Sequence, residues 1–197
     1  MSMKQIIKKV ICLPFKLLQC LFVIIFGLYY YELKYLKCHW FSDSIFAAGW
    51  SWAWIDIWHR ILFHKNKNIP WPCSPYIDCT SNVFFDPEDL DNFNQQGNYF
   101  QSINGGKIYL GRGTKIAKNV GIITSNHDLN DLELHQQSKN VIIGECCWVG
   151  MNSMILPGVE LGLHTIVGAG SVVTKSFSEG YCIIAGNPAK KIRDLEK

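Results

Sequence analysis

The sequence is poor in charge and lacks the spacings of several common binding motifs. Only 18% of its 197 residues are Asp, Glu, Lys or Arg, against about 25% in an average globular protein. Its eight cysteines form no Cys-x-x-Cys pair, and neither a P-loop nor a Gly-x-Gly-x-x-Gly loop is present. These absences argue against a disordered chain, a structural zinc site, a nucleoside-triphosphate enzyme and a hydride-transfer enzyme. The net charge of +3 is too small to indicate a nucleic-acid partner.

Basic charge is concentrated at the N-terminal end, beside the longest apolar run. Residues 1–40 hold six lysines against one glutamate and so carry +5, which leaves −2 for the other residues. Residues 17–31 are nearly all apolar, but these 15 residues are fewer than the about 20 of a spanning helix. Residues 40–63 hold five of the seven tryptophans, a density typical of a membrane interface. An alternative is that these aromatic residues cap a core or form an oligomer contact.

These features predict three segments. We expect residues 1–63 to form a helical membrane-associated segment that lies in one leaflet. We expect it to be retained, because no small-residue cleavage site follows the apolar run. Residues 64–82 are polar, hold three prolines and predict the entry into a second domain over 64–187. Residues 188–197 are predicted as a short basic C-terminal helix.

The C-terminal half has a period of six residues. Aliphatic residues recur at this spacing, glycine follows five of them, and small residues precede several of them by two positions. A helix would need a period of 3.6 and a half-buried strand a period of 2, so we predict a solenoid of triangular coils with the aliphatic side chains inside. A loop is extruded after residue 122 without loss of phase. The aliphatic positions are Leu110, Ile116, Ile122, Ile143, Val149, Ile155, Leu161, Val167 and Val173.

This repeat resembles that of the hexapeptide-repeat acyltransferases. The resemblance covers about residues 66–193 and is closest to sugar and surface-polysaccharide O-acetyltransferases. Its motifs are LGRGTKIAKNVGIITSNHD, VIIGECCWVGMNSMILPGVELG, TIVGAGSVVTKSF and AGNPAKKI. The resemblance implies an all-β fold class, a left-handed parallel β-helix beside the N-terminal helical segment, and a homotrimer with active sites at the subunit boundaries. It also implies acetyl-CoA as the acyl donor.

His127 matches the catalytic histidine of that family. An imidazole is a base suited to neutral pH, and it would take the proton of an attacking hydroxyl. The resemblance assigns Met151 the backbone N–H that stabilises the oxyanion. It places seven residues at the cofactor: Trp148, Ala169, Thr174, Lys175, Lys190, Lys191 and Arg193. Three residues near His127 are candidates for acceptor binding: Asn126, Asp128 and His135. No metal ligands are expected.

We therefore predict an enzyme that moves acetyl from acetyl-CoA to a sugar hydroxyl. The apolar N-terminal segment favours a lipid-linked or membrane-proximal surface glycan, at the cytoplasmic face of a bacterial inner membrane. Two other classes stay open. One is a non-catalytic trimeric scaffold on a membrane, and the other, with weaker support, is a metal enzyme like the γ-class carbonic anhydrases.

Overall fold

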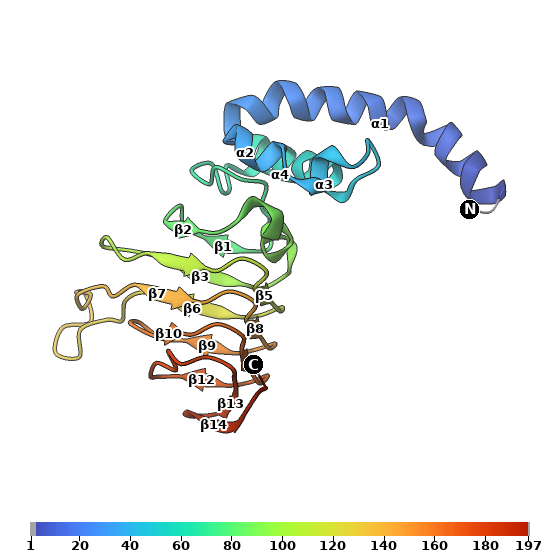
Figure 1. Ribbon diagram of the computed structural model, residues 1–197. Coiled ribbons are helices and arrows are strands. Elements are labelled where there is room, and N and C mark those ends of the chain that lie inside the picture. Colours follow the sequence, from blue (N-terminus) through green and yellow to red (C-terminus); the bar gives the residue numbers. More distant parts are fainter. Residues whose placement is uncertain (1–2, 197) are drawn as a thin grey trace. The chain divides into compact units, whose positions relative to one another are not determined.

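The computed structural model describes residues 3–196, and for residues 3–9 only the backbone. The chain forms two compact units, residues 1–75 and 76–197. The N-terminal unit is helical (Figure 1). Its helices are α1 (Met3–Tyr30), α2 (Leu33–Leu36), α3 (His39–Ser42) and α4 (Ala48–Phe63).

The N-terminal unit ends later than the boundary expected at residue 63, because the following segment is bound to α4. Arg60 donates from Nη1 to the Ile69 carbonyl at 2.7 Å and from Nη2 to the Trp71 carbonyl at 2.8 Å. The Cys73 N–H donates to Asp56 Oδ2 at 3.1 Å. Backbone groups of residues 69–73 are thereby satisfied inside the helical unit rather than in the second unit.

The second unit is a parallel β-helix whose strands form three faces (Figure 1). Face A holds β1 (Asp78–Cys79), β3 (Tyr99–Gln101), β6 (Gly121–Ile123), β9 (Met154–Ile155) and β12 (Val172–Val173). Face B holds β2 (Val83–Phe84), β4 (Ile108–Leu110), β7 (Val141–Ile143) and β10 (Glu160–Leu161). Face C holds β5 (Lys115–Ile116), β8 (Trp148–Val149), β11 (Thr165–Val167), β13 (Cys182–Gly186) and β14 (Ala189–Asp194).

The hexapeptide prediction is confirmed at the level of single residues. All nine predicted aliphatic positions are buried, each at most 5% exposed. The glycines that follow them lie where successive coils touch. A Cβ on Gly111 would lie 2.4 Å from the Glu145 nitrogen, and one on Gly150 would lie 2.7 Å from the Ala169 nitrogen. The close stacking of coils therefore excludes side chains at these corners.

The N-terminal end of the β-helix is covered by the 3₁₀ helix η1 (Pro87–Asn94), which lies beside the first strand of face C. Asn92 donates from Nδ2 to the Thr114 carbonyl at 2.9 Å and accepts from the Ile116 N–H at 2.8 Å. Asp89 accepts from the Gly113 N–H at 2.7 Å. These side chains satisfy backbone groups that a further coil would otherwise pair.

Two parts of the predicted fold class are wrong. The chain is not all-β, because four helices occupy most of residues 3–63. Residues 188–196 of the segment predicted as a C-terminal helix do not form a helix, and residue 197 lies outside the described residues. The chain turns back at Asn187-Pro188, and β14 pairs antiparallel with β13. This hairpin pairs the otherwise open edge of the last coil, which a separate helix would leave unsatisfied.

Ile155 tests the core of the β-helix. It is fully buried, so Ile155→Ala should lower the free energy of unfolding by about 2–5 kcal/mol through lost burial and a cavity. Ile192→Ala is the matched control, because Ile192 lies on β14 and is 62% exposed. Urea unfolding of both variants should separate them. Equal losses would contradict the assignment of the aliphatic column to the core.

Candidate active site

The extruded loop forms an antiparallel hairpin where the chain passes from face A to face B. The Gln136 N–H donates to the Asn126 carbonyl and the Asp128 N–H to the Leu134 carbonyl, both at 2.9 Å. His127 and His135 face each other across this ladder. The base of the hairpin is joined to the coils by Ser138, whose hydroxyl donates to the Ile103 carbonyl at 2.7 Å. The predicted acceptor residues are thus brought together with His127.

His127 is exposed, and its ring is oriented by the hairpin itself. Its Nδ1 lies 2.7 Å from the Leu132 carbonyl oxygen. Because a carbonyl only accepts, Nδ1 carries the hydrogen of the neutral ring and Nε2 is left as the basic nitrogen. The His135 ring packs against it, with ring centroids 4.5 Å apart and planes tilted by 32°. The arrangement leaves one nitrogen of an oriented imidazole able to accept a proton.

Asp128 orders the tip of the hairpin and not the His127 ring. Its Oδ1 accepts from the Asn130 N–H at 2.8 Å and from the Asp131 N–H at 3.3 Å. This is an Asx-turn, which holds a short loop without regular pairing. The tip also exposes three leucines, Leu129, Leu132 and Leu134, between 58% and 86%.

The predicted donor residues lie along the edge where face C passes to face A. Met151 follows β8 and Ala169 follows β11, one coil further on, and the Met151 carbonyl accepts from the Gly170 N–H at 2.8 Å. Within residues 3–196 the Met151 N–H has no protein acceptor, so it is available to a ligand. Trp148 points outward from β8 and is 54% exposed.

The other predicted cofactor residues are not all on that edge. Thr174 and Lys175 follow β12 and lie at the A-to-B edge, with Lys175 Nζ 5.6 Å from the centre of the Phe177 ring. Lys190, Lys191 and Arg193 lie on β14. Lys191 donates to Asp194 at 2.7 Å, and this hydrogen bond, together with the carboxylate charge, raises the pKa of Lys191.

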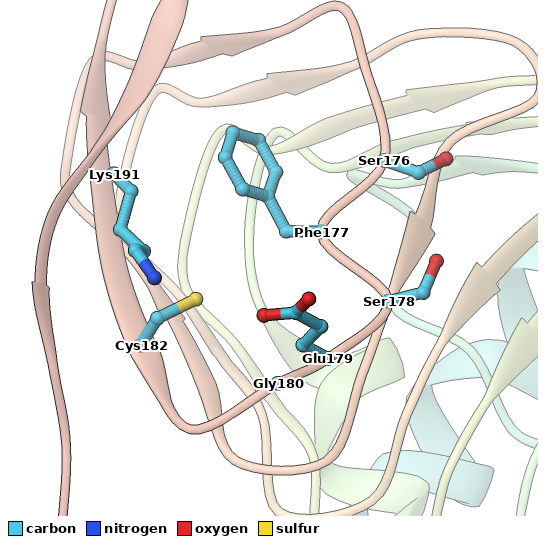
Figure 2. A pocket seen from close by; sticks show the side chains of 7 residues that line it. All are labelled: Ser176, Phe177, Ser178, Glu179, Gly180, Cys182 and Lys191. Carbon is cyan, nitrogen blue, oxygen red and sulfur yellow. The ribbon is translucent and has the colours of Figure 1, made fainter.

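Lys191 also lines a pocket of about 400 Å³ at the last coil (Figure 2). In Figure 2 the side chains of Glu179 and Lys191 point toward one another across it. The remaining lining residues are Ser176, Phe177, Ser178, Gly180 and Cys182. Sequence reasoning missed Glu179 and this pocket, because the pocket depends on the β14 hairpin that was predicted as a helix.

The arrangement within one chain is incomplete. His127 lies at the A-to-B edge, whereas Met151 and Ala169 lie at the C-to-A edge. A single β-helix therefore presents the predicted base and the predicted oxyanion donor on different edges. Sequence reasoning also missed the Leu132 carbonyl, since a backbone group leaves no signal in residue type. No three His, Cys, Asp or Glu side chains of residues 3–196 come together as a metal-binding group.

Comparisons with known proteins confirm the resemblance to the hexapeptide-repeat acyltransferases. The model of the family "Bacterial transferase hexapeptide (six repeats)" matches residues 140–175. A putative acetyltransferase of Saccharomyces cerevisiae is 36% identical over 124 residues, which cover 61% of this chain and 60% of the relative. The galactoside O-acetyltransferase of Lactococcus lactis is 30% identical over 137 residues, covering 61% of this chain and 66% of the relative.

The putative colanic acid biosynthesis acetyltransferase of Escherichia coli is 34% identical over 89 residues, covering 45% of this chain and 48% of the relative. The matched part of the chain spans less than two thirds of the length of these relatives. A hexapeptide-repeat acetyltransferase of Vibrio cholerae, solved with acetyl coenzyme A, aligns with a TM-score of 0.50 at 21% identity and covers 62% of this chain and 67% of that one. This likeness supports the β-helix fold, and the hexapeptide neighbours imply the left hand.

The Asx-turn gives a prediction for Asp128. Asp128→Ala removes the acceptor that holds the tip, so a protease should cut within residues 128–134 several-fold faster than in the wild type. Asp128→Asn keeps an oxygen acceptor and should be cut at close to the wild-type rate. Limited proteolysis with mass spectrometry measures both variants. Equal resistance of Asp128→Ala and the wild type would show that the carboxylate does not order the tip.

Proposed function

We propose that the protein is an O-acetyltransferase that moves an acetyl group from acetyl-CoA to a sugar hydroxyl. The observation that carries the proposal is the oriented imidazole of His127, whose Nδ1 is bound to the Leu132 carbonyl at 2.7 Å. The hexapeptide coils that carry the His127 hairpin resemble those of bacterial hexapeptide transferases. The Vibrio cholerae acetyltransferase with a similar fold was solved with acetyl coenzyme A.

The reaction uses His127 as a general base. Its Nε2 accepts the proton of the acceptor hydroxyl while the hydroxyl oxygen forms a bond to the thioester carbonyl carbon. The tetrahedral intermediate carries its negative charge on the former carbonyl oxygen. When it collapses, the carbon–sulfur bond breaks and the thiolate of coenzyme A takes the proton from the imidazolium. No covalent enzyme intermediate is required.

The N–H of Met151 is proposed to donate to the developing oxyanion. Loss of one well-placed donor of this kind costs about 3–4 kcal/mol in other enzymes. Trp148, Ala169, Thr174 and Lys175 are proposed to line the arm of acetyl-CoA. The cations of β14, Lys190, Lys191 and Arg193, are proposed to meet its phosphates. Lys191 already donates to Asp194, so it must give up this ion pair to bind a phosphate.

A homotrimer would complete the site. His127 lies at the A-to-B edge and Met151 at the C-to-A edge of one three-sided β-helix. The A-to-B edge of one copy must therefore face the C-to-A edge of the next copy to bring the two residues together. Three copies around an axis repeat this heterologous contact and close it. The exposed leucines of the hairpin tip are available for such a contact.

The acceptor is proposed to be a sugar of a lipid-linked or membrane-proximal surface glycan, held by Asn126, Asp128 and His135. A sugar acceptor is consistent with the names of two relatives, a galactoside O-acetyltransferase and a putative colanic acid biosynthesis acetyltransferase. Residues 1–63 are proposed to bind the cytoplasmic face of a bacterial inner membrane. One helix, over Val10–Tyr30, is long and apolar enough to cross a membrane, by length and composition only.

Free-thiol release from acetyl-CoA with a panel of free and lipid-linked glycans tests the activity. His127→Ala should lower kcat about 10²–10⁴-fold, because the base is lost. His164→Ala is the matched control, since His164 lies at a coil corner and stacks on Tyr181. No thiol release with any glycan, together with no coenzyme A binding, would favour the non-catalytic scaffold over the enzyme. Coenzyme A binding without thiol release would mean that the acceptor is missing from the panel.

Mixed oligomers test where the site lies. Neither His127→Ala nor Ala169→Trp, which fills the exposed donor edge, should be active alone. Co-expressed and co-purified, the two chains should regain a substantial fraction of activity, because the intact His127 of one chain meets the intact donor edge of the other. No recovery in a verified mixed oligomer would show that each site is built from one chain.

A further inference from the structure

The helical unit combines an apolar core, which includes Val23, Phe41 and Ile57, with several polar side chains held between its helices and many apolar side chains on its outer surface. Lys16 Nζ donates to Gln19 Oε1 at 2.8 Å and to Ser51 Oγ at 2.9 Å, so it is held between α1 and α4. Gln19 itself is 4% exposed. In a water-soluble helix pair these positions would carry the aliphatic residues.

A second polar group lies deeper in the same unit. Asp56 Oδ2 accepts from Tyr31 Oη at 2.8 Å and from Arg60 Nε at 2.9 Å, and the Asp56 and Arg60 side chains are at most 1% exposed. Arg60 is further satisfied by the two backbone carbonyls of residues 69 and 71. Asp56 and Arg60 of α4 are thus paired with each other inside the unit through Asp56 Oδ2, whereas Asp56 Oδ1 is buried with no hydrogen-bond partner among the described residues.

The outer side of α1 is apolar along most of its length. Exposed aliphatic residues recur at helical spacing along α1 from Val10 to Leu28. On α4, the exposed residues Ile55, Trp58 and Leu62 form a second stripe at positions i, i+3 and i+7. This stripe borders α1, because Trp58 stacks on Phe22. These exposed residues are Val10, Ile11, Leu17, Leu18, Leu21, Ile24, Ile25, Leu28, Ile55, Trp58 and Leu62. An apolar surface of this extent is unfavourable in water and favourable in a bilayer.

The segment that joins α1 to α4 is incompatible with an α1 that crosses the bilayer. It runs back beside α1, since Cys20 Sγ contacts the Ile45 carbonyl at 3.8 Å and Gly27 packs against Leu36. Figure 1 shows α1 lying along α2, α3 and α4. This returning segment is partly irregular and exposes Glu32, Lys34, Lys37, Ser42 and Asp43. If α1 crossed the bilayer, these groups would be drawn into the hydrocarbon, where charges and unpaired backbone are costly.

Charge at the two ends of the unit agrees with this conclusion. Lys4, Lys8 and Lys9 precede the apolar stretch, and Lys65 and Lys67 follow α4. Lysines close to a membrane segment favour the cytoplasmic side, so a crossing helix would leave one basic end on the wrong side. In addition, α4 has 16 residues and is only about 24 Å long, shorter than the ~30 Å hydrocarbon core.

We propose that α1 lies in the plane of one leaflet, with its outer face in the hydrocarbon and residues 32–47 toward the cytoplasm. The occupant of the apolar face is an anionic lipid bilayer. Both ends of the unit then stay on the cytoplasmic side, where acetyl-CoA is available. The proposal deepens the membrane binding stated under the proposed function and rests on it.

Vesicle binding separates the two sides of the unit with matched charges. Ile25→Lys adds a positive charge to the outer face, and Ser42→Lys adds the same charge to the returning segment. On phosphatidylglycerol–phosphatidylethanolamine vesicles, Ile25→Lys should bind at least tenfold more weakly than the full-length wild type, and Ser42→Lys at least as strongly. Thiol release with a water-soluble acceptor should be unchanged in both variants, so loss of membrane binding is distinguished from loss of catalysis.

Sidedness tests the orientation. Epitope tags at the two termini of the full chain, expressed in a bacterium, should both be digested in inside-out vesicles and both be protected in spheroplasts. Tags digested from opposite sides would show that α1 crosses the membrane and would overturn the proposal. Equal binding of Ile25→Lys and Ser42→Lys, or a wild-type protein in the soluble fraction, would overturn it too, because either result means that the apolar face does not enter the bilayer.

Discussion

The stacking of successive coils is the constraint on which the second unit depends. Neighbouring parallel strands lie about 4.8 Å apart, so every corner that passes close to the next coil must lack a bulky side chain. Gly111 and Gly150 meet this requirement, since a Cβ on either would lie within 2.7 Å of the next backbone. The same stacking places residues of equal phase in columns, which is how Met151 and Ala169 come to lie on one edge.

The interruption of the repeat is what creates the candidate base. Within the coils, the corner residue His164 stacks on Tyr181, whereas His127 projects from the surface with its ring held by a carbonyl. The extruded hairpin supplies both the projection and the carbonyl of Leu132, and Asp128 holds its tip through the Asx-turn. The candidate base is thus placed where the chain departs from the repeat, while the coils support the hairpin through Ser138. The loop length leaves the phase of the following coils unchanged, as the buried Ile143 shows.

The two units differ most in the side chains that they expose, because both have an apolar core but the helical unit also exposes many apolar residues. The β-helix places aliphatic residues inside and polar or charged ones outside. The helical unit buries the Asp56–Arg60 pair and holds the half-buried Lys16 against Ser51, while leucines and isoleucines of α1 face outward.

Local pattern was enough to predict the hexapeptide coils, their aliphatic core and the extruded loop, because a period of six with glycine at the corners is compatible with few other folds. It was also enough to single out His127 and the apolar N-terminal segment. The C-terminal hairpin was mispredicted, because β14 is formed by pairing with an edge of β13 that no local pattern reveals. The Leu132 carbonyl meets His127 only because the intervening residues fold into a hairpin, and the Asp56–Arg60 pair is buried only because Tyr31 and residues 69–73 pack around it. The separation of His127 from Met151 is likewise a property of the three faces, since only the coil geometry decides which edge each turn occupies.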